Sequence, residues 1–167
     1  MSTLHVENLK GLSSGGNANK IIIPSGQKLH AAGHVVQVVQ GQTSTQASTS
    51  STSYTDTGLS ASITPTSSSN KVLVVVTHND NRVPSTTPAI GVQLLRDSTE
   101  IQEVCKYHGF NAGGNAHLTI SATKLDSPST TSSVTYKTRF KRTQGSDTVY
   151  MQVDNTPATI TLMEIAQ

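Results

Sequence analysis

The sequence predicts an all-β fold, an antiparallel sandwich or barrel, and three observations support this prediction. Hydroxyl residues are abundant, with 22 Ser and 24 Thr among 167 residues, and both are unfavourable inside helices while Thr and Val suit strands. After Gly33, apolar and polar residues alternate with a period of two, and turn clusters of Gly, Pro, Ser and Asn separate the alternating segments. No segment carries the apolar stripe of an amphipathic helix. Short antiparallel strands packed as a sandwich or barrel are therefore expected.

Residues 1–32 are expected to form an extended N-terminal arm that precedes the β domain. Its apolar pieces are short, and the Gly/Ser/Asn cluster at residues 11–17 is typical of a turn or a flexible link. Such pieces cannot bury a core of their own, so the arm must lie on another surface. Three lysines against Glu7 also give the arm an excess of positive charge. The residues predicted to anchor it are Leu4, His5, Val6, Leu9, Lys10, Ile21, Ile22 and Ile23.

Residues 33–167 are expected to form the sandwich domain from about nine strands and a tenth at the end of the chain. Alternation is clear in most of them, as between Val134 and Phe140. The low-complexity segment 43–53 is compatible with a mobile loop or with an extended edge strand. The predicted strands begin near Val35, Tyr54, Ser60, Val72, Ala89, Ile101, Leu118, Val134 and Val149, and the last ends at Ile165.

Two of these strands are apolar on both faces. Residues 72–76 form an unbroken apolar run, and the last strand places Ile160 and Leu162 on one face with Met163 and Ile165 on the other. Because a sandwich strand has one core to face, a second apolar face needs a partner surface. Either the arm covers this face or copies of the chain associate through it, and both can hold at once. The residues predicted at an oligomer interface are Val72, Val74, Val76, Met163 and Ile165.

Composition argues against several classes of protein. The longest run of large apolar residues, 72–76, is far shorter than the roughly 20 residues that span a bilayer, and no membrane partner is expected. A net charge of +2, from 12 basic and 10 acidic residues, is too even to indicate a nucleic-acid partner. The single cysteine, Cys105, permits no internal disulfide and is more typical of a small buried side chain than of a nucleophile.

No motif predicts catalysis, a metal site or a cofactor. The six histidines form neither a His-Glu-x-x-His nor a His-x-His pattern, and no Cys-x-x-Cys is present. Because no helix is expected, no Ser lies at the strand-to-helix turn of a nucleophile elbow. One polar segment has the Asp and Asn chemistry of a ligand or receptor loop, although a polar turn is the plainer interpretation. Its residues are His78, Asn79, Asp80, Asn81 and Arg82.

A basic strip is predicted on one expected strand. Lys137, Arg139 and Lys141 share a face and extend over roughly 13 Å, at about 3.3 Å per residue, and Arg142 follows them. The chain has four Tyr, two Phe and no Trp, too few aromatic residues for a platform that stacks nucleic-acid bases. The strip is expected to be a solvated strand face or a charge pair between subunits, and its candidate ligands are an acidic glycan and the acidic surface of a partner.

Six segments that together cover nearly the whole chain carry a family resemblance: STLHVENLKG, NKIIIPSGQKLHAAGHVVQVVQ, YTDTGLSASITPTSSSNKVLVVV, VQLLRDSTEI, LDSPSTTSSVTYKTRFK and TITLMEIAQ. Taken in this order, they resemble virion structural proteins of tailed bacteriophages. The resemblance is to the short fibre, fibre-tip and capsid-decoration proteins of marine and cyanobacterial phages.

The resemblance implies a non-enzymatic virion protein with an attaching N-terminal segment and a jelly-roll-like β-sandwich that is usually trimeric. The expected partners are the chain itself as a homotrimer, other virion proteins of the coat or tail, and as a further candidate a host-surface glycan. The chain lacks the long repetitive shaft of a full tail fibre, which favours a knob, a head fibre or a capsid decoration or cement protein. A small tail-fibre or tail-tip component and a lectin-like host-receptor-binding module stay open. The expected location is the particle surface, after assembly in the reducing host cytoplasm, which suits a chain without disulfides.

Overall fold

The computed structural model describes residues 11, 13–16, 18, 20–23, 25, 31–84, 88–109 and 115–167. The chain divides into two compact units, residues 1–31 and residues 32–167, and each is described by itself. The described part of the second unit contains ten strands and one short 3-10 helix. They are β1 (Val35–Thr43), β2 (Ala47–Thr49), β3 (Thr55–Ile63), β4 (Lys71–Val83), β5 (Ala89–Arg96), β6 (Thr99–His108), β7 (Ala116–Asp126), β8 (Val134–Gln144), β9 (Val149–Met151), the helix η1 (Val153–Asn155) and β10 (Ala158–Ile165).

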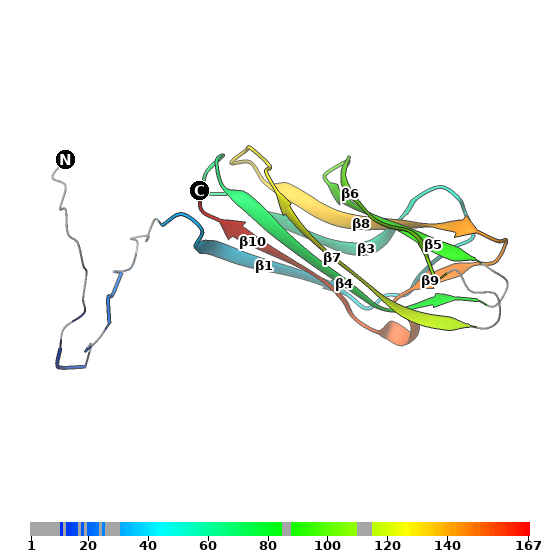
Figure 1. The fold of residues 1–167 in the computed structure, drawn as a ribbon, viewed down its shortest axis with the longest axis horizontal. Helices are drawn as coiled ribbons and strands as arrows, with labels where there is room; N and C mark the ends of the chain where they lie inside the picture. The colour runs from blue at the N-terminus through cyan, green and yellow to red at the C-terminus, as the bar shows by residue number, and fades with distance from the viewer. Residues whose placement is uncertain are drawn as a thin grey trace. The chain divides into compact units, whose positions relative to one another are not determined.

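The strands form two antiparallel sheets that pack as a sandwich (Figure 1). Sheet A has the order β1-β10-β4-β9-β2, with β7 also paired to β4, and sheet B has the order β3-β8-β5-β6. Setting the short β2 and β9 aside, the first strand pairs with the last, the second with the seventh, the third with the sixth and the fourth with the fifth. The chain thus follows one long hairpin folded over into two layers, which is the jelly-roll arrangement. The predicted fold class is confirmed.

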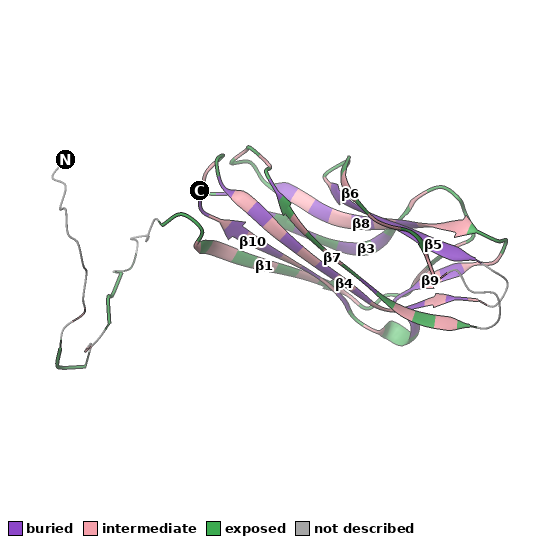
Figure 2. Cartoon of the chain, viewed as in Figure 1, coloured by how far each residue is buried: buried purple, intermediate pink, exposed green. Residues whose placement is uncertain are grey.

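The core lies between the sheets and is built from alternate residues of each strand. Burial alternates along β4, β8 and β10, as the banding in Figure 2 shows. Each large side chain removed from water stabilises the fold by roughly 1.5–3 kcal/mol. The largest buried apolar side chains are Tyr136, Phe140, Leu59, Ile63, Ile90, Leu94, Leu95, Met151, Ile160 and Leu162.

One strand prediction needs correction, and one that was left open is resolved in favour of a short edge strand. The starts predicted near Tyr54 and Ser60 belong to a single strand, β3, in which the pairing with β8 shifts register between Asp56 and Ser60. Gly58 lies inside this shift with a φ of 84°, a backbone conformation that glycine adopts without steric cost. The low-complexity segment contains the short strand β2, which pairs with β9.

A chain of hydrogen bonds around His78 connects the two sheets through the core. The His78 side chain is fully buried, and its Nε2 lies 2.9 Å from Oγ1 of Thr138 on β8. The Gln152 Nε2 donates to its Nδ1 at 2.7 Å, and Thr138 Oγ1 lies 2.6 Å from Oγ1 of Thr57 on β3. These partners fit the neutral ring with its proton on Nε2. Burial lowers the pKa of His78 to about 4, from a usual value of 6.5.

The open edges of the two sheets meet where β1 approaches β3. A Cβ atom added to Gly41 of β1 would lie 2.0 Å from the carbonyl oxygen of Ser60 and 3.1 Å from the Cβ of Ala61. Both of these residues belong to β3. The missing side chain at Gly41 therefore allows the backbones of the two sheets to come into contact at this edge.

We predict that Gly41→Ala destabilises the protein by about 2 kcal/mol, because the methyl group must push β1 away from β3. Gly16→Ala is the matched control, since a Cβ at Gly16 meets no atom within 4 Å. Urea unfolding of both variants measures the difference. Equal midpoints for the two variants would show that the contact between β1 and β3 is looser than described.

We also predict that the protein loses stability as the pH falls from about 6.5 to about 4, the window set by the pKa of His78. In this window the unfolded chain binds a proton that the folded chain excludes, so the loss reaches about 3 kcal/mol at about 1.4 kcal/mol per pH unit. Urea unfolding at a series of pH values measures the slope, and His78→Gln is expected to remove most of it between pH 5 and 6.5. A slope unchanged in His78→Gln contradicts the prediction.

Candidate functional site

The predicted anchoring residues fall into two groups. Leu4, His5, Val6, Leu9 and Lys10 lie outside the described residues. Ile21, Ile22 and Ile23 are described and exposed, and no strand includes them. Their contact with a partner therefore stays a prediction.

The predicted oligomer interface is wrong for β4. Val72, Val74 and Val76 are fully buried between the two sheets, where they form part of the main core cluster. A residue that fills the core of its own subunit cannot line a contact between subunits. The opposite face of β4 carries the two apolar residues that remain, Leu73 and Val75, and both are half-buried. For β10 the predicted face is retained, because Met163 and Ile165 are half-buried between fully buried neighbours.

Leu73 and Met163 belong to an apolar row that crosses the outer face of sheet A. Val38 of β1 pairs with Met163 of β10, Met163 pairs with Leu73 of β4, and Leu73 pairs with Leu125 of β7. Side chains directly opposite each other lie about 5 Å apart, so the four form one continuous surface. The two ends are open to solvent, with 59% of Val38 and 50% of Leu125 exposed. We call Val38, Met163, Leu73 and Leu125 the apolar row.

The paired positions on the two sides of the apolar row differ in polarity. On one side, Val35 pairs with Ile165, and Ile165 pairs with Lys71. On the other side, Gln40 donates a hydrogen bond to Thr161 at 3.1 Å, and the same register continues through Val75 and Thr123. The next register contains Gln42, Thr159, Thr77 and Ser121. The apolar part of the face thus lies at the end of the sheet where β1 begins and β10 ends.

A buried carboxylate holds this end of β10 in place. The Glu164 side chain points into the molecule and accepts hydrogen bonds from the Thr66 backbone N–H at 2.7 Å, from the Asn70 side chain at 2.6 Å and from Gln37 at 2.6 Å. Thr66 Oγ1 donates a fourth at 2.8 Å. Burial raises the pKa of Glu164, but these hydrogen bonds outweigh it and hold the pKa below its usual value. Met163 is therefore held in its outward orientation.

A second buried carboxylate fixes the end of the apolar row at Leu125. Asp126, next to Leu125, accepts 2.7 Å hydrogen bonds from Arg96 of β5 and from the Tyr136 hydroxyl of β8. Burial, together with this contact to Asp126, raises the pKa of Tyr136. Asp126 thus ties β7 of sheet A to two strands of sheet B. Because the Glu164 carboxylate beside Met163 and the Asp126 carboxylate beside Leu125 are held by hydrogen bonds, the shape of the row is preorganised for a partner.

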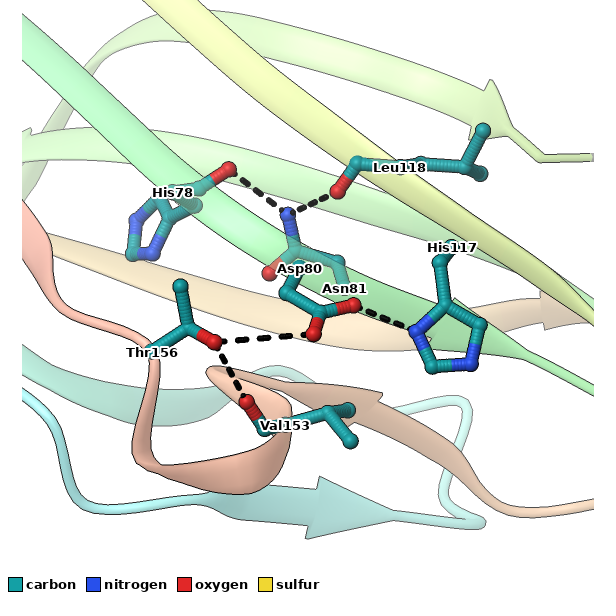
Figure 3. Close-up of polar contacts among 7 residues, drawn as sticks. All are labelled: His78, Asp80, Asn81, His117, Leu118, Val153 and Thr156. Atoms are coloured by element: carbon teal, nitrogen blue, oxygen red, sulfur yellow. Dashed lines mark hydrogen bonds and ion pairs between the residues drawn. The ribbon is translucent and has the colours of Figure 1, made fainter.

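The predicted ligand or receptor loop is not a loop. Residues 78–82 lie within β4, at a β-bulge where the pairing with β7 shifts between His78 and Asn81 and where Asp80 has a φ of 50°. Figure 3 shows the Asn81 amide donating to the carbonyls of His78 and Leu118, at 2.9 and 3.0 Å. The figure also shows Asp80 between Thr156 and His117, whose Nδ1 is hydrogen-bonded to the Asp80 carboxylate.

These side chains do not converge on one ligand. His78 and Asn81 are fully buried, and Asn79 donates to the Pro157 carbonyl at 2.9 Å. The Arg82 guanidinium stacks 4.2 Å from the centre of the Tyr150 ring. The segment therefore shapes β4 and its connections, and sequence reasoning missed this because a bulge leaves no alternation to detect.

The basic strip lies on the outer face of sheet B, as predicted, but part of its charge is already engaged. Lys137 forms an ion pair with Asp56 at 2.9 Å, and Arg139 donates to the Gln93 side chain at 2.8 Å. Arg139 and Lys141 also lie over the Tyr54 ring, at 4.9 and 4.4 Å from its centre. Lys141 and Arg142 form no ion pair with a carboxylate in the described part of the chain.

Other chemistry is sparse among the described residues. No group of three or more His, Cys, Asp or Glu is placed to hold a metal ion there. Residues 11–15 match the letters Gly-x-Ser-x-Gly, but Ser13 lies in an exposed bend rather than between a strand and a helix. Burial raises the pKa of Cys105 to about 11, which disfavours the reactive thiolate. In the same residues, no helix has the length and apolar character needed to cross a bilayer.

Comparisons with known proteins found no matching protein-family model and no matching curated protein. Among solved structures, a chain of infectious bursal disease virus, Gx strain, is similar with a TM-score of 0.43 and 12% identity, over 87% of this chain and 41% of that chain. A chain of the Gt strain of the same virus gives a TM-score of 0.41 and 12% identity, over 99% of this chain and 47% of that chain. The protein thus spans less than half the length of either viral chain. At these values neither match bears on what the protein does.

Proposed function

We propose that the protein is a non-enzymatic structural component of a virus particle, and that its jelly rolls associate as a homotrimer through the outer face of sheet A. The observation that carries the proposal is the apolar row, which runs in register across four strands and is open at both ends. Large apolar side chains gathered on one face mark an interaction site. Association removes this surface from water, which contributes about 25 cal/mol for each Å² buried.

The sequence segments that resemble phage virion proteins support the particle setting, and the jelly-roll topology is an architecture used by capsid and lectin domains. Within that setting we propose a head fibre, a knob or a capsid decoration protein. Its arm, residues 1–32, would bind coat or tail proteins by adding a strand to an exposed sheet edge. Three arms on one trimer would strengthen a weak single contact through effective concentration. A small tail-tip component is the alternative.

We predict that the double variant Val38→Lys, Leu125→Lys is a folded monomer. Both side chains are exposed on the single chain, so the substitutions leave the core intact but place two unpaired charges in the proposed contact. Sedimentation equilibrium gives the mass, and circular dichroism reports the fold. Thr119→Lys is the matched control, because Thr119 is exposed on β7, on the same face as Leu125 but roughly 20 Å further along the strand.

The expected result is a trimer for the wild type and for Thr119→Lys, and a monomer for the double variant. A wild-type monomer at tens of micromolar would refute the homotrimer. A double variant that stays trimeric with an unchanged mass would place the contact elsewhere on the molecule.

We further predict that a chain lacking residues 2–28 stays folded and trimeric but no longer sediments with virus particles. The core and both sheets lie in residues 32–167, so the fold does not require the arm. Sedimentation equilibrium, thermal unfolding and co-sedimentation with particles measure the three properties. A truncated chain that aggregates or loses its cooperative unfolding would show instead that the arm covers the apolar row of its own sandwich.

A further inference from the structure

A basic cleft lies on the outer face of sheet B, away from the proposed oligomer contact. Its volume is about 130 Å³, and it is lined by Thr52, Lys106, Tyr107, Lys141, Arg142 and Thr143. Three of these six residues are cationic, and they come from two strands, β6 and β8. The cleft is therefore formed by strands that are separate in the sequence, and the basic strip along β8 alone does not predict it.

Gly91 lies close to three residues that line the cleft. Gly91 of β5 pairs with Lys141, and an added Cβ would lie 2.8 Å from Cγ2 of Thr143 and 3.6 Å from Cε of Lys141. The same atom would lie 3.4 Å from the Lys106 carbonyl oxygen. With no side chain on Gly91, the residues of β6 and β8 that line the cleft come close together across β5.

The cationic groups are oriented by neighbours that leave their charge uncompensated. The Arg142 Nε donates to the Ser50 carbonyl at 2.8 Å, and its backbone N–H donates to the Ser51 carbonyl at 3.0 Å. Lys141 lies over the Tyr54 ring. Within the described residues, Lys106, Lys141 and Arg142 form no ion pair. The cleft thus combines three cationic residues, none of which forms an ion pair with a carboxylate in the described part of the chain.

The acidic residues of the same face lie outside the cleft lining. Glu100 accepts a 2.6 Å hydrogen bond from Gln93, which itself accepts one from Arg139. Glu103 of β6 pairs in register with Gln93 of β5. Burial raises the pKa of Tyr54, and the negative charges of Glu103 and Glu100 raise it further. The face is therefore acidic at one end and basic at the cleft.

We propose that this cleft binds an acidic saccharide, with a sulfate or carboxylate group held between Lys106, Lys141 and Arg142 and the sugar ring packed on Tyr107. The Tyr107 side chain lines the cleft, is 53% exposed, and has the Lys106 ammonium 5.9 Å from its ring centre. A volume of about 130 Å³ is well below the roughly 300–1,000 Å³ of pockets for drug-sized ligands. It accommodates one anionic substituent, while the remainder of the saccharide lies across the exposed aromatic ring.

Isothermal titration calorimetry of the full chain tests the site with four probes: a heparin-derived hexasaccharide, an oligogalacturonate, a neutral dextran oligosaccharide and a single-stranded DNA oligonucleotide. We expect binding of the first, the second or both, no binding of dextran, and weaker binding at higher salt. The ratio of the two acidic affinities distinguishes a sulfate from a carboxylate site. Tighter binding of the DNA oligonucleotide than of either acidic saccharide would overturn the proposal.

Lys106→Ala and Lys141→Ala are each expected to weaken saccharide binding about tenfold, the usual effect of losing one charged hydrogen bond. Lys137→Ala is the matched control, because Lys137 lies on the same strand and face as Lys141 but is paired with Asp56. Its affinity is expected to stay within about twofold of the wild type, as for a screened surface pair. Equal losses of affinity in all three variants would show that binding depends only on the net charge of the protein, and would refute the proposed site.

The aromatic contact has its own test. Tyr107→Leu is expected to weaken binding of the acidic saccharide, Tyr107→Phe to retain it, and inorganic sulfate to bind both variants equally. If Tyr107→Leu leaves saccharide binding unchanged, the cleft is an anion site without a saccharide contact and the proposal fails. The site does not depend on the proposed trimer, because the double variant Val38→Lys, Leu125→Lys is expected to keep the same affinity per chain.

Discussion

The two-residue period of β4 and β10 is the constraint on which the rest of the structure depends. In a sheet, a shift of one residue moves every side chain to the opposite face. The structure places Val72, Val74 and Val76 inside with Ile160 and Leu162, and the intervening Leu73 and Met163 outside. Because these outer positions are also apolar, the sandwich completes its core and still exposes an apolar row. The proposed association follows from this surplus of apolar surface.

The polar groups inside the molecule explain why that choice of face is stable. Glu164, Asp126 and His78 all point inward, and each is surrounded by hydrogen-bond partners from other strands and connecting segments. A one-residue shift of β10 or β7 would bring Met163 or Leu125 inward but would expose or orphan these groups, at a cost of several kcal/mol for a buried charge. The buried carboxylates therefore specify the register that apolar pattern alone leaves open.

Sequence reasoning succeeded where one face of a strand is polar and failed where both faces are alike. Alternation identified β8, and the abundance of Ser and Thr, together with that alternation, identified the fold class. In residues 72–76 the odd-numbered and the even-numbered residues are all apolar, so the pattern could not show which set fills the core. The bulge at Asp80 was mistaken for a loop because Asn and Asp are typical turn residues. The basic cleft needs β6 and β8 on the two sides of β5, an arrangement that spacing along one strand cannot reveal.

The two faces of the sandwich differ in chemistry, apolar on sheet A and charged on sheet B, and the central claim is that the apolar face is covered by other copies of the chain. Methyl NMR of the full chain with a soluble nitroxide tests this most directly. As the protein is concentrated, the methyl signals of Met163, Leu73 and Leu125 should become protected from the nitroxide while Thr143, in the cleft on sheet B, stays accessible. Methyl groups of the apolar row that remain equally accessible at every concentration would contradict the account.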